Sequence, residues 1–144
     1  MARQSDAYML RRLRAAEGYL ELGMPDQALE ELDQIDSPGP YEAAKSFLKG
    51  EALKAQEHYE EAAQSLQRAA LMFPFPHGRR AWQSLSECLR RTGREALADA
   101  AETNASLLEK AEHVLEKLAE SLGEPSIIIN ITIQPRARRK KRQR

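Results

Sequence analysis

Apolar residues recur at steps of three and four positions along most of the chain, which is the spacing that places them on one face of a helix. Met9, Leu13 and Leu20 belong to the first such run, and a second run passes through Leu32. Short segments rich in glycine and proline separate the runs, and these residues do not extend a helix. The pattern therefore predicts an all-α fold in which the helices are joined in pairs.

The pairs repeat at a nearly constant interval. Each second helix carries an alanine at the same place, and the three alanines are 34 and then 36 positions apart: Ala28, Ala62 and Ala98. Each first helix carries a small residue at the same place: Ala16, Gly50 and Ser86. Small side chains allow two helix backbones to approach closely, and a period in the thirties is typical of stacked helical arrays. We expect three helix-turn-helix units over about residues 9–40, 43–76 and 79–110.

The second unit has the most regular pattern, carried by Gly50, Leu53, Tyr59, Ala62, Leu66, Ala69 and Pro74. These residues resemble the tetratricopeptide repeat, a helix-turn-helix unit that stacks into a right-handed superhelix with a concave groove. The resemblance extends over about residues 7–110 and predicts a tetratricopeptide-like helical repeat domain over residues 7–122. It also implies that the first helices of the three units line the groove.

A stripe of apolar residues continues beyond the third unit, at Leu108, Ala111, Leu115, Leu118 and Leu122. We expect a capping helix over about residues 107–122 to cover the last apolar layer of the array. Ser106 and Glu109 fit a capping box, which favours a separate helix beginning near Leu107. A continuous helix from about Glu95 to Leu122 and a coiled-coil dimer stay open as alternatives.

The period then changes from 3.6 to 2, which predicts a short lone β-strand over residues 126–134. Four isoleucines point to one side of this strand: Ile127, Ile129, Ile131 and Ile133. A lone apolar strand has unpaired edges, so we expect self-association or addition to the sheet of a partner. A homodimer through residues 107–134 follows from the first option. An extended segment along the helical body is the alternative.

Charge is distributed very unevenly, although the net charge of the chain is zero. Residues 1–135 contain 15 basic and 22 acidic residues, a net charge of −7, and the last nine positions contain seven basic residues, a net charge of +7. The seven are Arg136, Arg138, Arg139, Lys140, Lys141, Arg142 and Arg144. Residues 135–144 are predicted to be a disordered basic tail that solubilises the chain or binds RNA, DNA or an anionic surface without sequence specificity.

The resemblance also implies which side chains face the groove: Leu10, Leu13, Glu17, Leu20, Phe47, Glu51, Lys54, Arg80, Gln83, Glu87 and Arg90. Glu17, Glu51 and Glu87 occupy the same place in successive units, and such a ladder of carboxylates favours a cation between them. We therefore expect a peptide ligand with apolar anchors against Leu10, Leu13 and Phe47 and basic residues near the glutamates.

Catalytic and metal-binding patterns are not found in the sequence. Cys88 is the single cysteine, no glycine-rich phosphate loop or zinc-binding pair of histidines occurs, and no run of 18 apolar residues could span a membrane. We expect a protein without cofactor or metal that is cytoplasmic, or nuclear if eukaryotic. The predicted function is a non-catalytic protein-protein interaction module, such as a scaffold or adaptor. The alternative is a polyanion-associated protein tethered to RNA, DNA or a ribosome through its tail.

Overall fold

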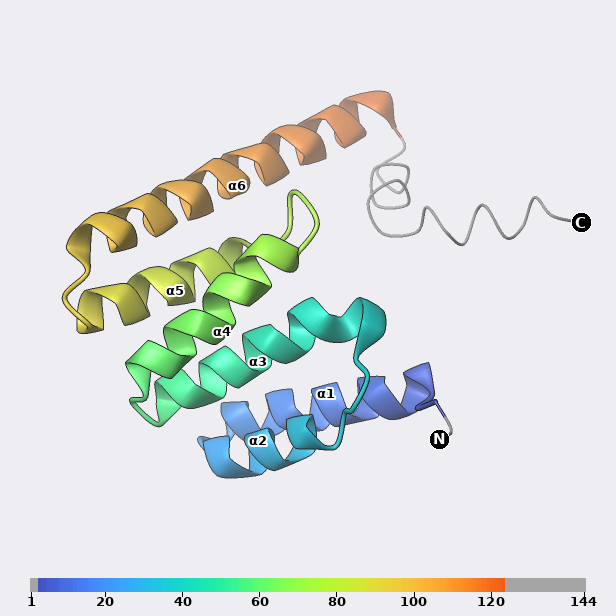
Figure 1. Cartoon of the computed structure of the whole chain (residues 1–144). Coiled ribbons are helices and arrows are strands. Elements are labelled where there is room, and N and C mark those ends of the chain that lie inside the picture. The colour runs from blue at the N-terminus through green and yellow to red at the C-terminus, as the bar shows by residue number, and fades with distance from the viewer. Residues whose placement is uncertain (1–2, 124–144) are drawn as a thin grey trace, which may run out of the picture.

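The computed structural model describes residues 3–123, which fold into helices joined by short turns (Figure 1). The helices are α1 (Asp6–Glu21), α2 (Pro25–Asp33), α3 (Glu42–Ala55), α4 (Tyr59–Met72), α5 (Arg79–Arg91) and α6 (Glu95–Leu122), with a short 3₁₀ helix, η1 (Gly39–Tyr41), before α3. The predicted all-α class is confirmed for this part of the chain. The predicted strand over residues 126–134 and the predicted disordered tail over residues 135–144 lie outside the described residues.

Each helix packs mainly against its neighbours along the chain. The helices form three pairs: α1 with α2, α3 with α4, and α5 with α6. α1 also contacts α3, and α3 contacts α5, so the first helices of successive pairs lie next to one another. All three begin at the same side of the molecule, the right in Figure 1. This arrangement places residues from three distant segments of the sequence along one face.

The same turn joins the two helices of each pair. Gly23, Glu57 and Gly93 have positive φ angles of 72°, 64° and 78°. In the first turn the Met24 N–H donates to the Tyr19 carbonyl at 2.8 Å, and the equivalent bonds of the second and third turns measure 2.9 and 2.8 Å. This hydrogen bond closes the end of a right-handed helix at a residue with left-handed backbone conformation, a position where glycine is preferred. The repeated turn gives the three pairs a common geometry.

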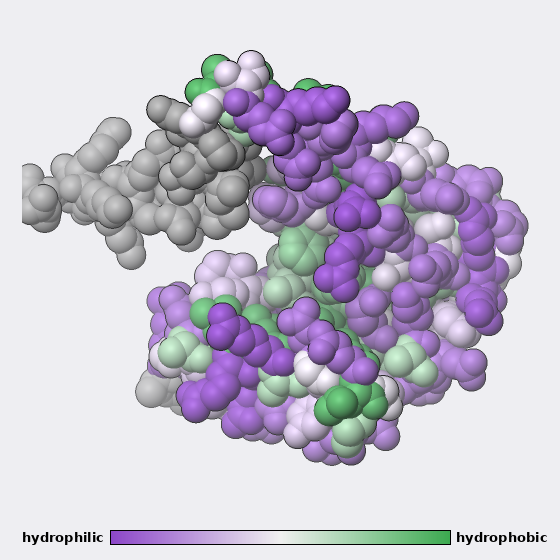
Figure 2. Space-filling model, turned by 180° about the vertical axis from the view of Figure 1, so that it is seen from behind, coloured by the Kyte–Doolittle hydropathy of each residue, from purple (hydrophilic) through white to green (hydrophobic). Residues whose placement is uncertain are grey.

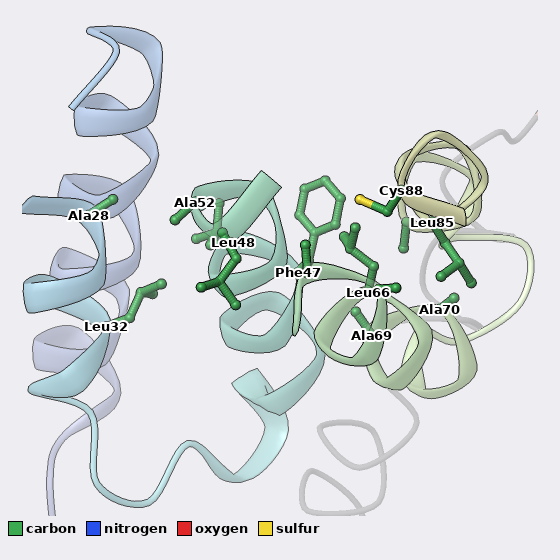
Figure 3. Close-up of a cluster of buried hydrophobic side chains, with 14 of the residues drawn as sticks. Ala28, Leu32, Phe47, Leu48, Ala52, Leu66, Ala69, Ala70, Leu85 and Cys88 are labelled. Atoms are coloured by element: carbon green, nitrogen blue, oxygen red, sulfur yellow. The ribbon is translucent and has the colours of Figure 1, made fainter. Parts of the chain in front are cut away.

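Small residues bring the helices together within the pairs. Ala16, Ala28, Ala62 and Ala98 are fully buried. A methyl group built on Gly50 of α3 would lie 2.5 Å from Cγ of Leu66 on α4, closer than two carbon atoms can approach. Figure 3 shows that the buried side chains form a continuous row from α2 through α3 and α4 to α5.

The prediction of a separate capping helix near Leu107 is wrong, because α6 is one helix of 28 residues. Ser106 lies in its middle and is exposed. No glycine or proline occurs between Glu95 and Gly123, and the surrounding alanines and leucines favour helix, so the local capping pattern does not interrupt it. α6 extends beyond α5, and the end of its predicted stripe, Leu118 and Leu122, remains exposed rather than covering the last layer.

Candidate functional site

A hollow of about 380 Å³ lies across the middle of α1, the first half of α3 and the beginning of α5. Its apolar lining comes from α1, α3 and the segment after α4: Leu10, Leu13, Ala44, Phe47, Leu48 and Phe73. Phe47 and Phe73 meet edge to face, with their ring centroids 6.2 Å apart. On the face that Figure 2 shows, hydrophobic surface lies at the bottom of a recess and hydrophilic surface surrounds it.

A second hollow of about 340 Å³ continues from the first toward the ends of α1 and α3. Glu17, Phe47, Leu48 and Arg80 line both hollows, so the two are adjoining parts of one depression. We call this depression the groove. Its second part is more polar, because Glu21, Glu51 and Lys54 also line it.

Most of the side chains expected to face the groove line it. The structure brings eight of the eleven together in the two hollows: Leu10, Leu13, Glu17, Leu20, Phe47, Glu51, Lys54 and Arg80. The remaining three line a different hollow between α5 and α6: Gln83, Glu87 and Arg90. Lys54 connects the two regions, since its ammonium group reaches Glu87 across the gap between α3 and α5.

Lys54 is a cation placed between two of the three stacked glutamates. Its Nζ lies 2.8 Å from Glu87 Oε2 and 3.6 Å from Glu51 Oε1. Burial alone would lower the pKa of Lys54, but the hydrogen bond to Glu87 and the charges of both glutamates outweigh burial and raise it. The chain itself therefore supplies the cation expected at Glu51 and Glu87. Among residues 3–123, Glu17 forms no ion pair.

Arg90 is neutralised by α6 and does not face the groove. Its guanidinium pairs with Glu95 at 3.1 Å, with Asp99 at 3.0 Å and with Glu102. The hydrogen bond to Asp99 is the largest of the effects that raise the pKa of Arg90. This cluster fastens the end of α5 to the beginning of α6. A role for Arg90 in ligand binding is therefore not supported by its surroundings.

Several residues of the groove were not expected from the sequence. Arg14 lies on its rim, Phe73 and His77 come from the connection between α4 and α5, and Glu112 comes from the second half of α6. Glu112 Oε2 lies 3.5 Å from Nε of Arg79. The repeat pattern could not place Phe73, His77 and Glu112, because they belong to a connection and to the extension of α6.

Cys88 is fully buried between helices, and burial raises the pKa of its thiol to about 11. A thiol with so high a pKa is a weak nucleophile at neutral pH. Within residues 3–123 no group of three or more acidic, histidine or cysteine side chains could hold a metal ion. No helix in the same range is long and apolar enough to cross a membrane. Comparison of the chain with protein-family models, with curated proteins and with solved structures gives no match in any of the three.

Proposed function

We propose that the helical body is a non-catalytic protein-protein interaction module that binds a peptide segment in the groove. The observation that carries this proposal is the apolar hollow of about 380 Å³ built by successive first helices. Binding sites are typically concave and mainly apolar, with a few polar groups that fix the orientation of the ligand. Because the hollow continues into a second one along the helices, the depression suits an elongated ligand better than a compact one.

In this proposal the three helix pairs are tetratricopeptide-like units of a right-handed superhelix. The common turn at Gly23, Glu57 and Gly93 supports it, because identical turns give identical pair geometry. The close approach of Gly50 to Leu66 supports it as well, because the second unit has glycine where the resemblance expects a small residue. A plain helical bundle would not require this turn to recur with the sequence period.

Selection from a random peptide library against the intact chain tests whether the groove binds peptides. Leu10 lines the groove and is 37% exposed, so Leu10→Gln should weaken binding by about tenfold through loss of an apolar contact. Leu71→Gln is the matched control, because Leu71 of α4 is 68% exposed and does not line the groove. Equal affinity of both variants for every selected peptide would contradict the proposed function.

Self-association through residues 107–134 stays a prediction, and exposed side chains of α6 favour it. Leu107, Val114, Leu118 and Leu122 are all exposed. Light scattering of the intact chain and of a chain ending at Glu124 tests the contribution of the predicted strand. A dimer that becomes a monomer on truncation supports pairing through the strand. A monomeric parent chain, or an unchanged dimer, contradicts it.

Association with a polyanion is the second candidate function, and one observation favours it. Seven of the last nine positions are basic, whereas the preceding 135 residues carry a net charge of −7. Contacts with phosphates release counterions, so binding through the tail should weaken steeply with salt and disappear when residues 135–144 are removed. Binding of RNA or DNA that survives this truncation would contradict the tethering role of the tail.

A further inference from the structure

The groove has a basic end. Arg14 of α1 and Arg79 of α5 line only its first hollow, as does Glu112, whereas Arg80 and Glu17 line both hollows. The Arg80 guanidinium lies over the Phe47 ring, 5.2 Å from the ring centroid. Within residues 3–123, neither Arg14 nor Arg80 forms an ion pair. Nε of Arg79 is buried and donates no hydrogen bond within the described residues, although Oε2 of Glu112 lies 3.5 Å away.

The groove has an acidic end as well. Glu21 and Glu51 line only its second hollow, as does Lys54, whereas Glu17 lines both hollows. Among the described residues neither Glu17 nor Glu21 forms an ion pair, and Lys54 lies closer to Glu87 than to Glu51. Oε1 of Glu51 is buried and accepts no hydrogen bond within residues 3–123. The carboxylates of this end are therefore less fully compensated than those of Glu95, Asp99 and Glu102 around Arg90.

The backbone reinforces both ends. Leu10 and Ala44 of the first hollow come from the first halves of α1 and α3, and Arg79 and Arg80 from the beginning of α5. In the second hollow, Leu20, Glu21 and Ala55 come from helix ends. A helix carries positive partial charge at its N-terminus and negative partial charge at its C-terminus. At α5, Gly78 provides no side chain to cap the free N–H groups, and the first turn contains no acidic residue.

We propose that the groove orients its ligand by charge: the ligand is a peptide with acidic residues at one end, an apolar anchor in the middle and basic residues at the other end. The acidic residues lie against Arg14, the anchor fills the hollow over Phe47, and the basic residues lie against Glu21 and Glu51. This inference rests on the proposed function, because it specifies the chemistry of the peptide that the groove takes. A peptide with acidic and basic residues at both of its ends would place basic residues beside the arginines and acidic residues beside the glutamates, where like charges repel.

The test uses random peptides of about twelve residues, which span about 40 Å when extended, displayed as a library and selected on the intact chain. Peptides whose binding depends on Leu10 are retained and sequenced. We expect acidic residues to gather on one side of the apolar anchor and basic residues on the other. Groove-dependent peptides without such separation of charge would overturn the inference and leave the proposed function intact. If no selected peptide depends on Leu10, the proposed function itself fails.

A charge reversal in the protein gives the second measurement. Arg14→Glu should weaken the binding of a charge-separated peptide by about tenfold, and replacing the acidic residues of the peptide with lysine should restore binding to this variant. Arg11→Glu is the matched control: Arg11 is also an exposed arginine of α1 that forms no ion pair within residues 3–123, but it does not line the groove. Equal losses for the two variants, or no rescue by the lysine peptide, would contradict charge orientation.

Discussion

Replacement of Gly50 by alanine tests the close packing of α3 against α4. The added methyl group would lie 2.5 Å from Cγ and 2.7 Å from Cδ2 of Leu66, and 3.2 Å from the Leu66 backbone nitrogen. Leu66 is fully buried and its Cγ is attached close to the backbone, so the side chain cannot simply swing away. The two helices must move apart, or Leu66 must leave its preferred rotamer.

The expected effect is the difference between two opposing contributions. Overpacking of a well-filled core costs about 1 to 3 kcal/mol. Alanine is favoured over glycine within a helix by about 1 kcal/mol, which offsets part of that cost. We expect Gly50→Ala to lower the free energy of unfolding by up to about 2 kcal/mol and Tm by up to about 8 °C.

Gly18→Ala is the matched control, because Gly18 also lies within a helix, α1, and a methyl group there would meet no atom within 4 Å. It should raise the free energy of unfolding by about 0.5 to 1 kcal/mol, since only the helix preference acts. Urea denaturation followed by circular dichroism measures both variants. A Gly50→Ala protein that is as stable as Gly18→Ala would refute the close packing.

Four further predictions follow from individual side chains and from the tail. Glu57→Gly should stabilise the fold by about 1 kcal/mol in urea denaturation, because the left-handed conformation strains glutamate and not glycine; an unchanged midpoint would contradict this. Lys54→Met should destabilise it by about 1 kcal/mol at pH 7. That difference should shrink above pH 10.5, because contact with Glu87 raises the folded pKa above this ordinary value and the contribution is lost on deprotonation; a difference that grows with pH would refute the ion pair. Cys88 should react with a thiol reagent at pH 8 only after unfolding, because it is buried and its pKa is raised to about 11; rapid labelling of the native protein would show that it is accessible. If residues 135–144 bind single-stranded nucleic acid through all seven charges, a plot of log K against log salt concentration should have a slope near −5, about 0.7 per charge; a slope near zero would exclude this mode.

Helix positions could be predicted closely from the sequence, because glycine and proline residues mark where the helices end and begin. Gly23 follows α1 and Pro25 begins α2, where a segment with glycine and proline separates two apolar runs of the sequence. The continuity of α6 did not follow, because a capping-box pattern at Ser106 is a local signal. The residues before and after Ser106 favour helix, and they keep α6 continuous there.

The groove could be predicted in part. Repeat register placed Leu10, Phe47 and Glu51 on one face, because equivalent positions of equivalent units face the same way. Repeat register does not determine which carboxylate a long side chain contacts, so the ion pair between Lys54 and Glu87 could be found only in the structure. It also cannot locate groove residues outside the repeat, such as Glu112 of the extended α6.

The most direct test of peptide binding in the groove is methyl NMR of the intact chain with and without a selected peptide. Leucine methyl signals report separately on the groove, through Leu10, Leu13 and Leu48, and on exposed surfaces elsewhere, through Leu71 and Leu107. Peptide binding in the groove predicts that the signals of the first three residues shift and that those of the other two do not. Shifts confined to Leu71 or Leu107 would contradict the proposed function.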